Sequence, residues 1–469
     1  MSKVLIIGAG PAGISCAYEL IKSGHEVEIY EGSNFVGGMS RSFELWGQTV
    51  DLGPHRFFSK NKRINAFFKE IIQEDFTLVN RLTRIHYKDS FFHYPLQFFN
   101  VLRNLSFITI FQILKDYFIQ RLRPSQELNS FEDWIVDRFG KKLFEIFFKN
   151  YSEKLWGIPC DKIDAKWAAQ RIKKLSLIEA IWNSIKGNSK KHETLIHQFP
   201  YPNEGTGIIY ERAADYVCEN GGEIHFNQRV KRVLVEAGKA CGIELENGTI
   251  HKSDYVVSTM PLTNLVEGID SVPKEIKGIS KQLYFRNTIL VYLEIDAQNL
   301  FEDNWIYIHS SEVQHGRITN FRNWSKSLCK DKKETILCLE YWAFDTDEIW
   351  TQDDEKIALL AKKEIRQLGL VNSKTAIKNS KTIRIPKCYP VYETGYQEHL
   401  SKVENYLDTI ENLLPIGRYG SFKYNNQDHS ILMGILAAER IFKGSDVDLW
   451  ALNTDTEYQE EGRIKDVLI

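Results

Sequence analysis

The stretch that decides the fold is KVLIIGAGPAGISCAYELIKSGHEVEIYE, residues 3–31. The apolar, largely β-branched residues at 4–7 predict a short strand that is buried on both faces. Apolar residues then recur at three- and four-residue spacing, which predicts a helix over 12–23, and a second strand follows over 26–30. Strand, turn, helix and strand in this order form a parallel βαβ unit, so an α/β fold is predicted.

Three glycines in the turn have the G-x-G-x-x-G spacing of a Rossmann-type dinucleotide site. Gly8 allows a tight turn, Gly10 lets the main chain approach a pyrophosphate, and Gly13 lets the helix pack closely on the strand. Glu31 ends the second strand about 20 residues further on, where a carboxylate can bind both ribose hydroxyls. A 2′-phosphate would meet a like charge there, which disfavours NADP and leaves FAD and NAD open.

A second glycine pair follows in EGSNFVGGMSRS, residues 31–42, where Gly37 and Gly38 precede Arg41. This stretch resembles the one that continues the FAD site in flavoproteins of the amine oxidase, protoporphyrinogen oxidase and UDP-galactopyranose mutase superfamily. The resemblance implies that FAD is the cofactor and that Gly38 and Arg41 belong to its site.

The length, net charge and cysteine content limit which binding partners and which cellular compartment are expected. The length of 469 residues predicts two or three sub-domains, and a formal net charge of −2 gives no electrostatic reason to expect nucleic acid. Seven scattered cysteines without CxxC spacing predict neither a metal site nor a disulfide framework, and they favour the cytoplasm. No leader or transmembrane segment is expected, since the apolar run 105–114 falls short of the roughly 20 residues that span a bilayer. A peripheral membrane contact through the phenylalanines around that run stays open.

The rest of the chain predicts insertions into the nucleotide-binding unit. Helical spacing dominates over about 61–190, hairpins follow over about 221–261, and residues 280–345 predict an antiparallel sheet. We therefore predict a discontinuous, Rossmann-type FAD-binding domain with an inserted helical domain and an antiparallel-sheet substrate domain. The expected bounds are 1–85, 196–270 and 406–469 for the three FAD-binding parts, 86–195 for the helical domain and 271–405 for the sheet domain.

Further motifs follow one another along the chain. They are DLGPHRFFS (51–59), HYPLQ (93–97), EKLWGIPCDKIDAKWAAQRI (153–172), WIYIHSSEVQHGRITNFRNWS (305–325) and GRYGSFKYNNQDHSILMG (417–434). In this order they resemble the UDP-galactopyranose mutase family, in its eukaryotic form more than in its bacterial form. The resemblance spans most of the chain, and the last motif is its most specific part.

The resemblance implies a role for individual residues of these motifs. The implied catalytic residues are His55, Arg171, Arg317 and Arg418. The implied substrate-binding residues are Tyr94, Gln97, Trp305, Tyr307, Tyr389 and Tyr424. The implied cofactor-binding residues, beyond the glycines, Glu31 and Arg41, are Val230, Gly417, Asn426, Gln427, Asp428 and Ser430. Arginine suits a diphosphate, because its planar and permanently charged guanidinium presents a fork of donors.

The last motif also has a meaning in chemistry alone. Asp428, His429 and Ser430 are predicted to cap a helix that starts near Ile431. The positive N-terminal end of such a helix would stabilise negative charge on a reduced flavin. The motif is therefore interpreted as a turn that tunes the cofactor.

The resemblance implies a flavin-dependent mutase that interconverts the pyranose and furanose forms of a UDP-sugar (UDP-galactose-like) for surface polysaccharide biosynthesis. In that chemistry N5 of reduced FAD attacks the anomeric carbon, so the isomerisation is redox-neutral, and an external reductant such as NAD(P)H is compatible with it. Pro54 and Leu96 depart from the family pattern near the sugar and the base. The sequence therefore leaves the sugar, the base, the reductant and the oligomeric state open.

Two other functions stay open. One is an FAD-dependent oxidoreductase of the protoporphyrinogen oxidase or amine oxidase type, with an apolar substrate in the helical domain. The other is a non-enzymatic scaffold that carries FAD. An oxidoreductase of that type would not need Arg171 and Arg317 to converge, so the positions of the arginines distinguish it from a mutase.

Overall fold

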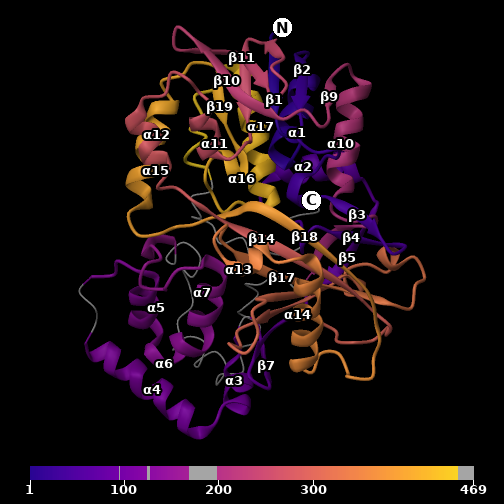
Figure 1. The fold of residues 1–469 in the computed structure, drawn as a ribbon, viewed down its shortest axis with the longest axis vertical. Coiled ribbons are helices and arrows are strands. Elements are labelled where there is room, and N and C mark those ends of the chain that lie inside the picture. Colours follow the sequence, from indigo (N-terminus) through magenta and orange to yellow (C-terminus); the bar gives the residue numbers. More distant parts are fainter. Residues whose placement is uncertain (95, 124–126, 168–197, 453–469) are drawn as a thin grey trace.

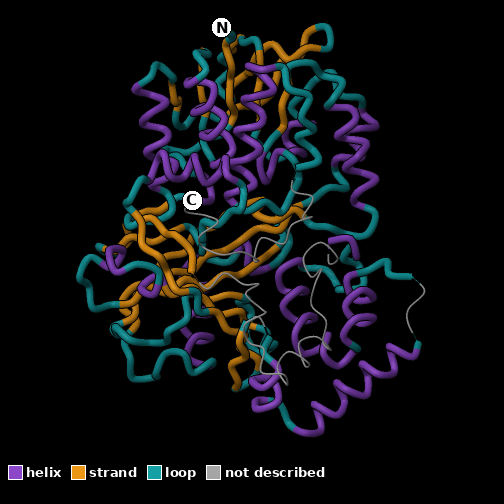
Figure 2. Tube along the Cα trace, turned by 180° about the vertical axis from the view of Figure 1, so that it is seen from behind, coloured by secondary structure: helices purple, strands orange, loops and turns teal. Residues whose placement is uncertain are grey.

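The computed structural model describes residues 1–94, 96–123, 127–167 and 198–452. Figure 1 shows three regions: a parallel sheet with its helices at the top, a helical region at the lower left and a large mixed sheet at the lower right. The same three regions are visible from behind in Figure 2. The fold is the predicted α/β class with an antiparallel-rich second sheet.

The upper region is built on a sheet of five parallel strands in the described residues. In spatial order these are β19 (Leu413–Pro415), β13 (Tyr255–Ser258), β1 (Lys3–Ile7), β2 (Glu26–Tyr30) and β9 (Glu223–His225). The helix α1 (Pro11–Lys22) connects β1 to β2. The predicted strand–helix–strand unit is therefore confirmed to within one residue at each end.

Helices from distant parts of the sequence pack on this sheet. α1 contacts α17 (Gln427–Lys443) and α10 (Ile208–Glu219), and α10 contacts α2 (Lys62–Ile72). In Figure 1 the indigo N-terminal part and the yellow C-terminal part consequently lie side by side. The approach of α17 is close, since a Cβ on Gly434 would lie 2.3 Å from Ala12 O.

The stretch 221–261 was expected to form hairpins, and only its middle does. β10 (Val230–Glu236), β11 (Lys239–Leu245) and β12 (Ile250–Lys252) form an antiparallel meander. β9 and β13, at its two ends, instead join the parallel sheet beside β2 and β1. The hairpin prediction is wrong for these two strands, because their pairing partners lie about 200 residues or more away in the sequence.

The lower sheet has seven strands in the part of the chain that the structure describes. In spatial order they are β18 (Ile377–Pro390), β14 (Phe285–Ile295), β17 (Thr335–Ala343), β16 (Arg317–Asn320), β15 (Trp305–Ile308), β6 (Thr83–Tyr87) and β7 (Ser90–His93). Neighbours are antiparallel except β15 and β6. The antiparallel sheet predicted for residues 280–345 is confirmed, and β14 is buried along its whole length because separate apolar clusters cover its two faces.

The helical region is less uniform than the sequence predicts. Its helices are α3 (Phe98–Asn104), α4 (Phe107–Leu122), α5 (Phe131–Phe139), α6 (Lys141–Phe144), a π-helical turn at Glu145–Lys149 and α7 (Asn150–Trp156). The prediction of helix over 61–190 is wrong for β5 (Phe76–Asn80), β6 and β7: β5 and β6 pair with strands remote in sequence, and β7 forms a hairpin with β6. Within the described ranges, every helix is too short or too polar to cross a bilayer.

The remaining elements connect the regions. The strand pairs are β3 (Ser42–Leu45) with β4 (Gln48–Asp51), and β5 with β8 (Gln198–Pro202). The other helices are α11 (Leu262–Glu267), α12 (Lys274–Ser280), α13 (Glu348–Thr351), α14 (Asp354–Gln367), α15 (Tyr396–Leu407) and α16 (Gly417–Gly420). β4 leads directly into the loop that carries His55, so the strand pair β3–β4 positions a predicted site residue.

Candidate active site

The glycine turn between β1 and α1 leaves no room for side chains. Gly8 has a φ of +97°, and a Cβ there would lie 2.2 Å from Thr259 Oγ1. A Cβ on Gly13 would lie 2.0 Å from Gly8 O, so only glycine lets α1 begin this close to the strand. Gly10 is the N-cap of α1 and has no side chain that could occupy the first N–H groups. The helix start therefore presents main-chain donors to an anionic ligand.

The second glycine pair packs against this turn. The Gly37 N–H donates to Ala9 O over 2.8 Å, and a Cβ on Gly38 would lie 3.1 Å from Gly10 Cα. Arg41 follows three residues after Gly38, and its buried Nε has no hydrogen-bond partner within the described ranges. We call residues 8–13 and 37–41 the glycine cradle. Its surface is formed mostly by main-chain atoms rather than by side chains.

Glu31 lies where the sequence predicts a ribose ligand. Its carboxylate accepts hydrogen bonds from the Ala9 N–H and the Ser33 N–H, each over 2.8 Å. The Gln228 N–H donates to Glu31 O over 2.9 Å, and Val230 begins β10 two residues later. The acid and Val230 are thus both held at the end of β2, beside the glycine cradle.

α17 starts four residues before the predicted start at Ile431. Asn426 is the N-cap: its side chain accepts from the His429 N–H, and the His429 ring accepts from the Asn426 N–H over 3.3 Å. The predicted capping role is therefore wrong for Asp428 and Ser430, whereas His429 does cap the helix, through its bond with the Asn426 N–H. Asn is itself a strong N-cap, and the reciprocal bond with the third residue of the helix places all three predicted caps in the first turn.

The first turn of α17 contains buried polar atoms without partners. Gln427 Oε1 accepts from the Tyr210 hydroxyl over 2.7 Å. Gln427 Nε2 and Asp428 Oδ2 are buried and have no hydrogen-bond partner among the described residues. A Cβ on Gly417 would lie 3.0 Å from Ala12 Cβ, so this segment closes directly on α1. A bound polar cofactor beside the glycine cradle would supply the hydrogen-bond partners that these two buried atoms lack. The residues therefore fit FAD.

Three of the four residues predicted to be catalytic converge in the structure. The fourth, Arg171, lies outside the described residues. His55 follows β4, with Nδ1 3.1 Å from Gly53 O. Burial lowers the pKa of His55 to about 4, and the positive charges of Arg317 and Arg418 act in the same direction. The imidazole is therefore neutral at pH 7, within electrostatic range of two guanidinium groups that remain charged.

Arg317 is held by a carboxylate that sequence reasoning missed. It lies on β16 opposite Glu340 of β17, and its Nε and Nη2 each bind one oxygen of Glu340 over 2.6 Å. Burial would lower the pKa of Arg317, but Glu340 raises it, so the guanidinium stays charged. The sequence did offer a sign of this pair, since the apolar strand TILCLEYWA (335–343) contains a single acid. A buried carboxylate in a strand needs a partner.

Arg418 differs from Arg317 in having no carboxylate partner within the described residues. Its Nε donates to Cys388 O over 2.9 Å and its Nη1 donates to Asn425 O over 2.8 Å. The guanidinium lies 4.6 Å from the ring centroids of both Tyr389 and Tyr424, which stack on each other. Its Nη2 is buried and has no hydrogen-bond partner in this part of the chain. A buried cation of this kind can be compensated by an anionic ligand.

A row of aromatic rings continues from the arginines. Tyr151 of α7 lies 5.4 Å from Tyr307 and stacks on His309 at 5.0 Å, and Tyr307 lies 5.3 Å from Tyr94. Tyr151 is within electrostatic range of Arg317. Sequence reasoning missed Tyr151, because an aromatic residue at helical spacing is usually a core residue. The helical region thus contributes a side chain to this aromatic row, which otherwise comes from the sheet region.

Trp305 and Gln97 are less centrally placed. The Trp305 ring is 6% exposed and packs 5.6 Å from Trp324, with the Arg81 guanidinium 5.8 Å away. The same guanidinium lies 5.5 Å from the Tyr94 ring, which connects Trp305 to the aromatic row. Gln97 is exposed at the N-cap of α3 and makes no capping hydrogen bond with its side chain.

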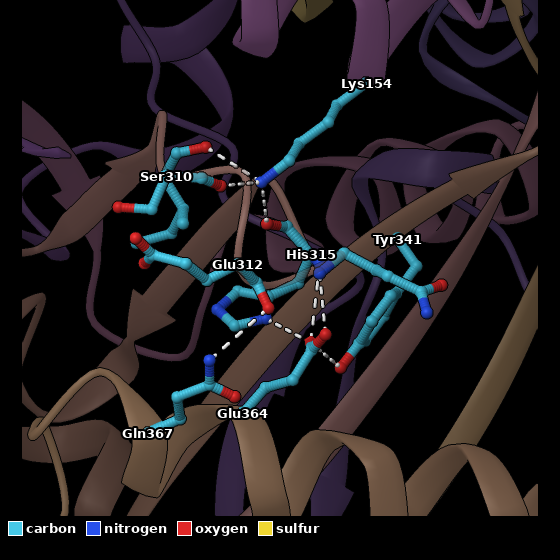
Figure 3. A network of polar contacts seen from close by, with 9 residues as sticks. Lys154, Ser310, Glu312, His315, Tyr341, Glu364 and Gln367 are labelled. Atoms are coloured by element: carbon cyan, nitrogen blue, oxygen red, sulfur yellow. Dashed lines mark hydrogen bonds and ion pairs between the residues drawn. The ribbon is translucent and has the colours of Figure 1, made fainter. Parts of the chain in front are cut away.

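The loop between β15 and β16 is clamped by the network shown in Figure 3. Lys154 of α7 donates to Ser310 O over 2.6 Å and to His315 O over 3.3 Å. Glu364 of α14 lies 2.6 Å from His315 Nδ1 and accepts from the Tyr341 hydroxyl over 2.9 Å. Burial lowers the pKa of Lys154 to about 8. The network connects the helical region to the strands that carry Tyr307 and Arg317, and so holds α7 against them.

A model of the family described as flavin containing amine oxidoreductase matches residues 11–441 of the chain. Among curated proteins, the 1-hydroxycarotenoid 3,4-desaturase of Flavobacterium sp. (strain P99-3) is 23% identical over 337 residues, which cover 65% of this chain and 67% of the relative. The chloroplastic/chromoplastic zeta-carotene desaturase of Capsicum annuum is 28% identical over 267 residues, which cover 50% of this chain and 42% of the relative. The chain therefore matches only part of either relative's length.

Among solved structures, a reduced UDP-galactopyranose mutase superposes with a TM-score of 0.85 at 22% identity. The superposition covers 99% of this chain and 98% of that one. At this identity the likeness shows the fold alone. The sequence relatives are thus named as desaturases and the structural neighbour as a mutase.

Proposed function

We propose that the chain, which belongs to the family of flavin containing amine oxidoreductases, is a flavin-dependent mutase that acts on a sugar nucleotide. FAD, the cofactor that this family implies, would be held by the glycine cradle, Glu31, Val230 and the first turn of α17. Reduced flavin, when bound, supplies a nucleophilic nitrogen beside the anomeric carbon. The net reaction interconverts the pyranose and furanose forms of a UDP-galactose-like sugar without net oxidation.

The observation that carries the proposal is the buried guanidinium of Arg418. Arg418 is buried and, in the described residues, its polar partners are main-chain carbonyl groups. Arg317 lies within electrostatic range of the same histidine, His55. Burying an uncompensated charge costs several kcal/mol, and Glu340 compensates Arg317 but not Arg418, so Arg418 favours an anionic ligand such as a nucleoside diphosphate. An apolar substrate would leave the charge of Arg418 uncompensated.

Each polar group of the pocket has a task in this proposal. Arg317 and Arg418 hold the diphosphate and stabilise the negative charge that grows on it as its bond to the anomeric carbon breaks. The hydroxyl groups of Tyr389 and Tyr424 donate to the phosphate oxygens. His55, neutral at pH 7, would add no further positive charge beside the two arginines and would be available to hydrogen-bond the substrate or the cofactor. Tyr94, Gln97, Trp305 and Tyr307 bind the nucleoside end.

We place the reaction in the cytoplasm, at a step that supplies sugar nucleotides to surface polysaccharide biosynthesis. The free state of the seven cysteines supports this compartment. An external reductant such as NAD(P)H would bring the flavin into its reduced form.

The alternative is an FAD-dependent oxidoreductase that acts on an apolar substrate. The names of the sequence relatives favour it, because both are carotenoid or carotene desaturases. In that case the aromatic row from Tyr94 to Tyr151 would line the substrate channel, and the two arginines would serve the flavin alone.

Anaerobic turnover separates the two functions. The FAD-loaded protein is reduced with dithionite and incubated with UDP-galactopyranose, UDP-galactofuranose and a panel of other sugar nucleotides, followed by chromatography of the products. Ring isomers that require reduced flavin but consume no reductant are expected. If no sugar nucleotide is isomerised and none changes the flavin spectrum, the mutase proposal is wrong and the oxidoreductase remains.

A further inference from the structure

One face of α4 exposes a continuous stripe of large apolar side chains. Six residues form it, and their exposed fractions run from 47% for Ile119 to 91% for Phe107. The stripe consists of Phe107, Ile108, Phe111, Phe118, Ile119 and Leu122. At 100° per residue, all six lie within one third of the helix circumference. Exposed apolar residues are ordinary when scattered, but six on one face form a patch of the kind that meets a partner.

The position of α4 leaves this face open. The opposite side of the helix buries Ile113 and Tyr117 and packs on α5 and α6. In both Figure 1 and Figure 2, α4 runs along the outer edge of the helical region. The stripe therefore lies on the perimeter of the molecule and is separate from the candidate active site.

The charge around the stripe has one sign. Arg103, Lys115, Arg121 and Arg123 are exposed, and none of them forms an ion pair with a described residue. The only acid of α4, Asp116, is partly buried and accepts from the Lys142 N–H over 3.0 Å. A chain of net charge −2 thus presents a locally cationic, phenylalanine-rich surface. Phenylalanines that can enter an acyl boundary, combined with cations, fit anionic lipid headgroups.

A second copy of the chain fits this surface less well. Lys115 lies at the middle of α4 and on the apolar face itself, between Phe111 and Phe118 along the helix axis. If two α4 helices packed face to face about a twofold axis, the two Lys115 ammonium groups would meet inside an apolar interface. At a lipid surface, the same side chain extends to the headgroups while its methylene groups stay among the apolar residues.

We propose that α4 docks the protein on an anionic lipid surface, with the helix parallel to the membrane and the phenylalanines inserted at the boundary of headgroups and acyl chains. Because no described helix is able to span a bilayer, the contact is peripheral. The proposal does not depend on the reaction that the protein catalyses.

The test is co-sedimentation of the full-length, FAD-loaded protein with vesicles of phosphatidylcholine and phosphatidylglycerol at 3:1, and with vesicles of phosphatidylcholine alone. Binding to the anionic vesicles and at least tenfold weaker binding to the neutral ones are expected. Phe111→Asp combined with Phe118→Asp should reduce binding to the anionic vesicles at least tenfold. Leu359→Asp, at a residue 64% exposed on α14, is the matched control and should bind like the wild type.

Lys115→Glu combined with Arg121→Glu should lose the preference for anionic vesicles. All substituted side chains are exposed, and retained flavin absorbance confirms that the variants fold. The proposal is overturned if the wild type binds neither vesicle, or if the phenylalanine variant binds as well as the control. It is also overturned if light scattering shows a dimer that the phenylalanine variant dissociates, because a second copy would then be the occupant of the face.

Discussion

The glycine cradle and the arginine pocket (His55, Tyr151, Arg317, Glu340, Tyr389, Arg418 and Tyr424) lie in the same molecule but are built in different ways. The cradle depends on where side chains are absent: a methyl group on Gly13 would collide with Gly8 O. The pocket depends on which side chains are present, and it collects them from the loop after β4, from α7, β16, β17, β18 and α16, and from the loop between α16 and α17. Local sequence therefore specifies the cradle almost completely, whereas the pocket exists only once the three regions have packed together.

The largest effect is expected in the pocket, from Glu340→Gln. The change removes the carboxylate that neutralises buried Arg317, and we expect the free energy of unfolding to fall by about 4 kcal/mol. UDP should restore more stability in this variant than in the wild type, because its diphosphate replaces the lost charge. Thermal and urea unfolding with and without UDP measure both quantities. Glu294→Gln is the control, since this buried acid of β14 binds the neutral amide of Asn379; equal losses in the two variants would contradict the account.

In the cradle, Gly13→Ala should be the most damaging small change. Its Cβ would lie 2.0 Å from Gly8 O, so β1 and α1 must separate, at a cost of about 3 kcal/mol. The purified variant should carry little flavin, as measured by its absorbance after denaturation. Gly278→Ala is a matched control on α12, where an added Cβ meets no atom within 4 Å. Full flavin occupancy in Gly13→Ala would show that the helix start does not form the phosphate site.

The electrostatics of the pocket predict how His55 titrates. Its pKa is lowered to about 4 by burial and by the two arginines, so the ring stays neutral from pH 8 down to about 5. UDP adds negative charge beside the ring, and its binding should raise the pKa by about one pH unit, or about 1.4 kcal/mol. Histidine NMR on the FAD-loaded protein, with His55→Gln for assignment, measures this. A pKa near 6.5 without UDP, or a fall on adding UDP, would contradict the arrangement.

The smallest effect is expected from a single hydroxyl group. Tyr389→Phe keeps the ring under Arg418 and removes one donor to the diphosphate, so UDP should bind about fivefold more weakly, or about 1 kcal/mol. Calorimetric titration of the FAD-loaded protein measures the affinity. Tyr406→Phe, whose hydroxyl donates to Ser271 O at the surface, should bind UDP like the wild type. A loss as large as that from removing an arginine would mean that the tyrosine, and not the guanidinium, is the main anion ligand.

The same contrast explains what could be predicted from the sequence. The βαβ unit and its tight glycine turn were predicted correctly, because glycine spacing and apolar periodicity are local properties, while the role of Glu31 as a cofactor ligand stays a prediction. β6 could not be predicted as a strand of the lower sheet, since its partner β15 lies more than 200 residues away. The start of α17 was misplaced because Asn426 and Asp428 are both good N-caps, and only the packing of Gln427 against Tyr210 selects the first of them.

The motifs named several of the residues that converge in the structure, but not the residues that hold them in place. His55, Arg317, Arg418, Tyr389 and Tyr424 converge in the structure, whereas Glu340, Tyr151 and Lys154 carry no local sign of their tasks. A buried acid or lysine takes its meaning from a partner on another element, which spacing along the chain does not reveal. The domain bounds and the roles assigned to individual residues stay predictions.

The most direct test of the central claim, a diphosphate site beside the flavin, is calorimetric titration of UDP into the FAD-loaded protein and into Arg418→Met. We predict one UDP per chain for the wild type and at least a hundredfold loss of affinity in Arg418→Met, about 3 kcal/mol, with flavin content unchanged. Arg440→Met, an exposed arginine of α17, should bind UDP like the wild type. Failure of the wild type to bind UDP, or equal binding by Arg418→Met, would contradict the claim.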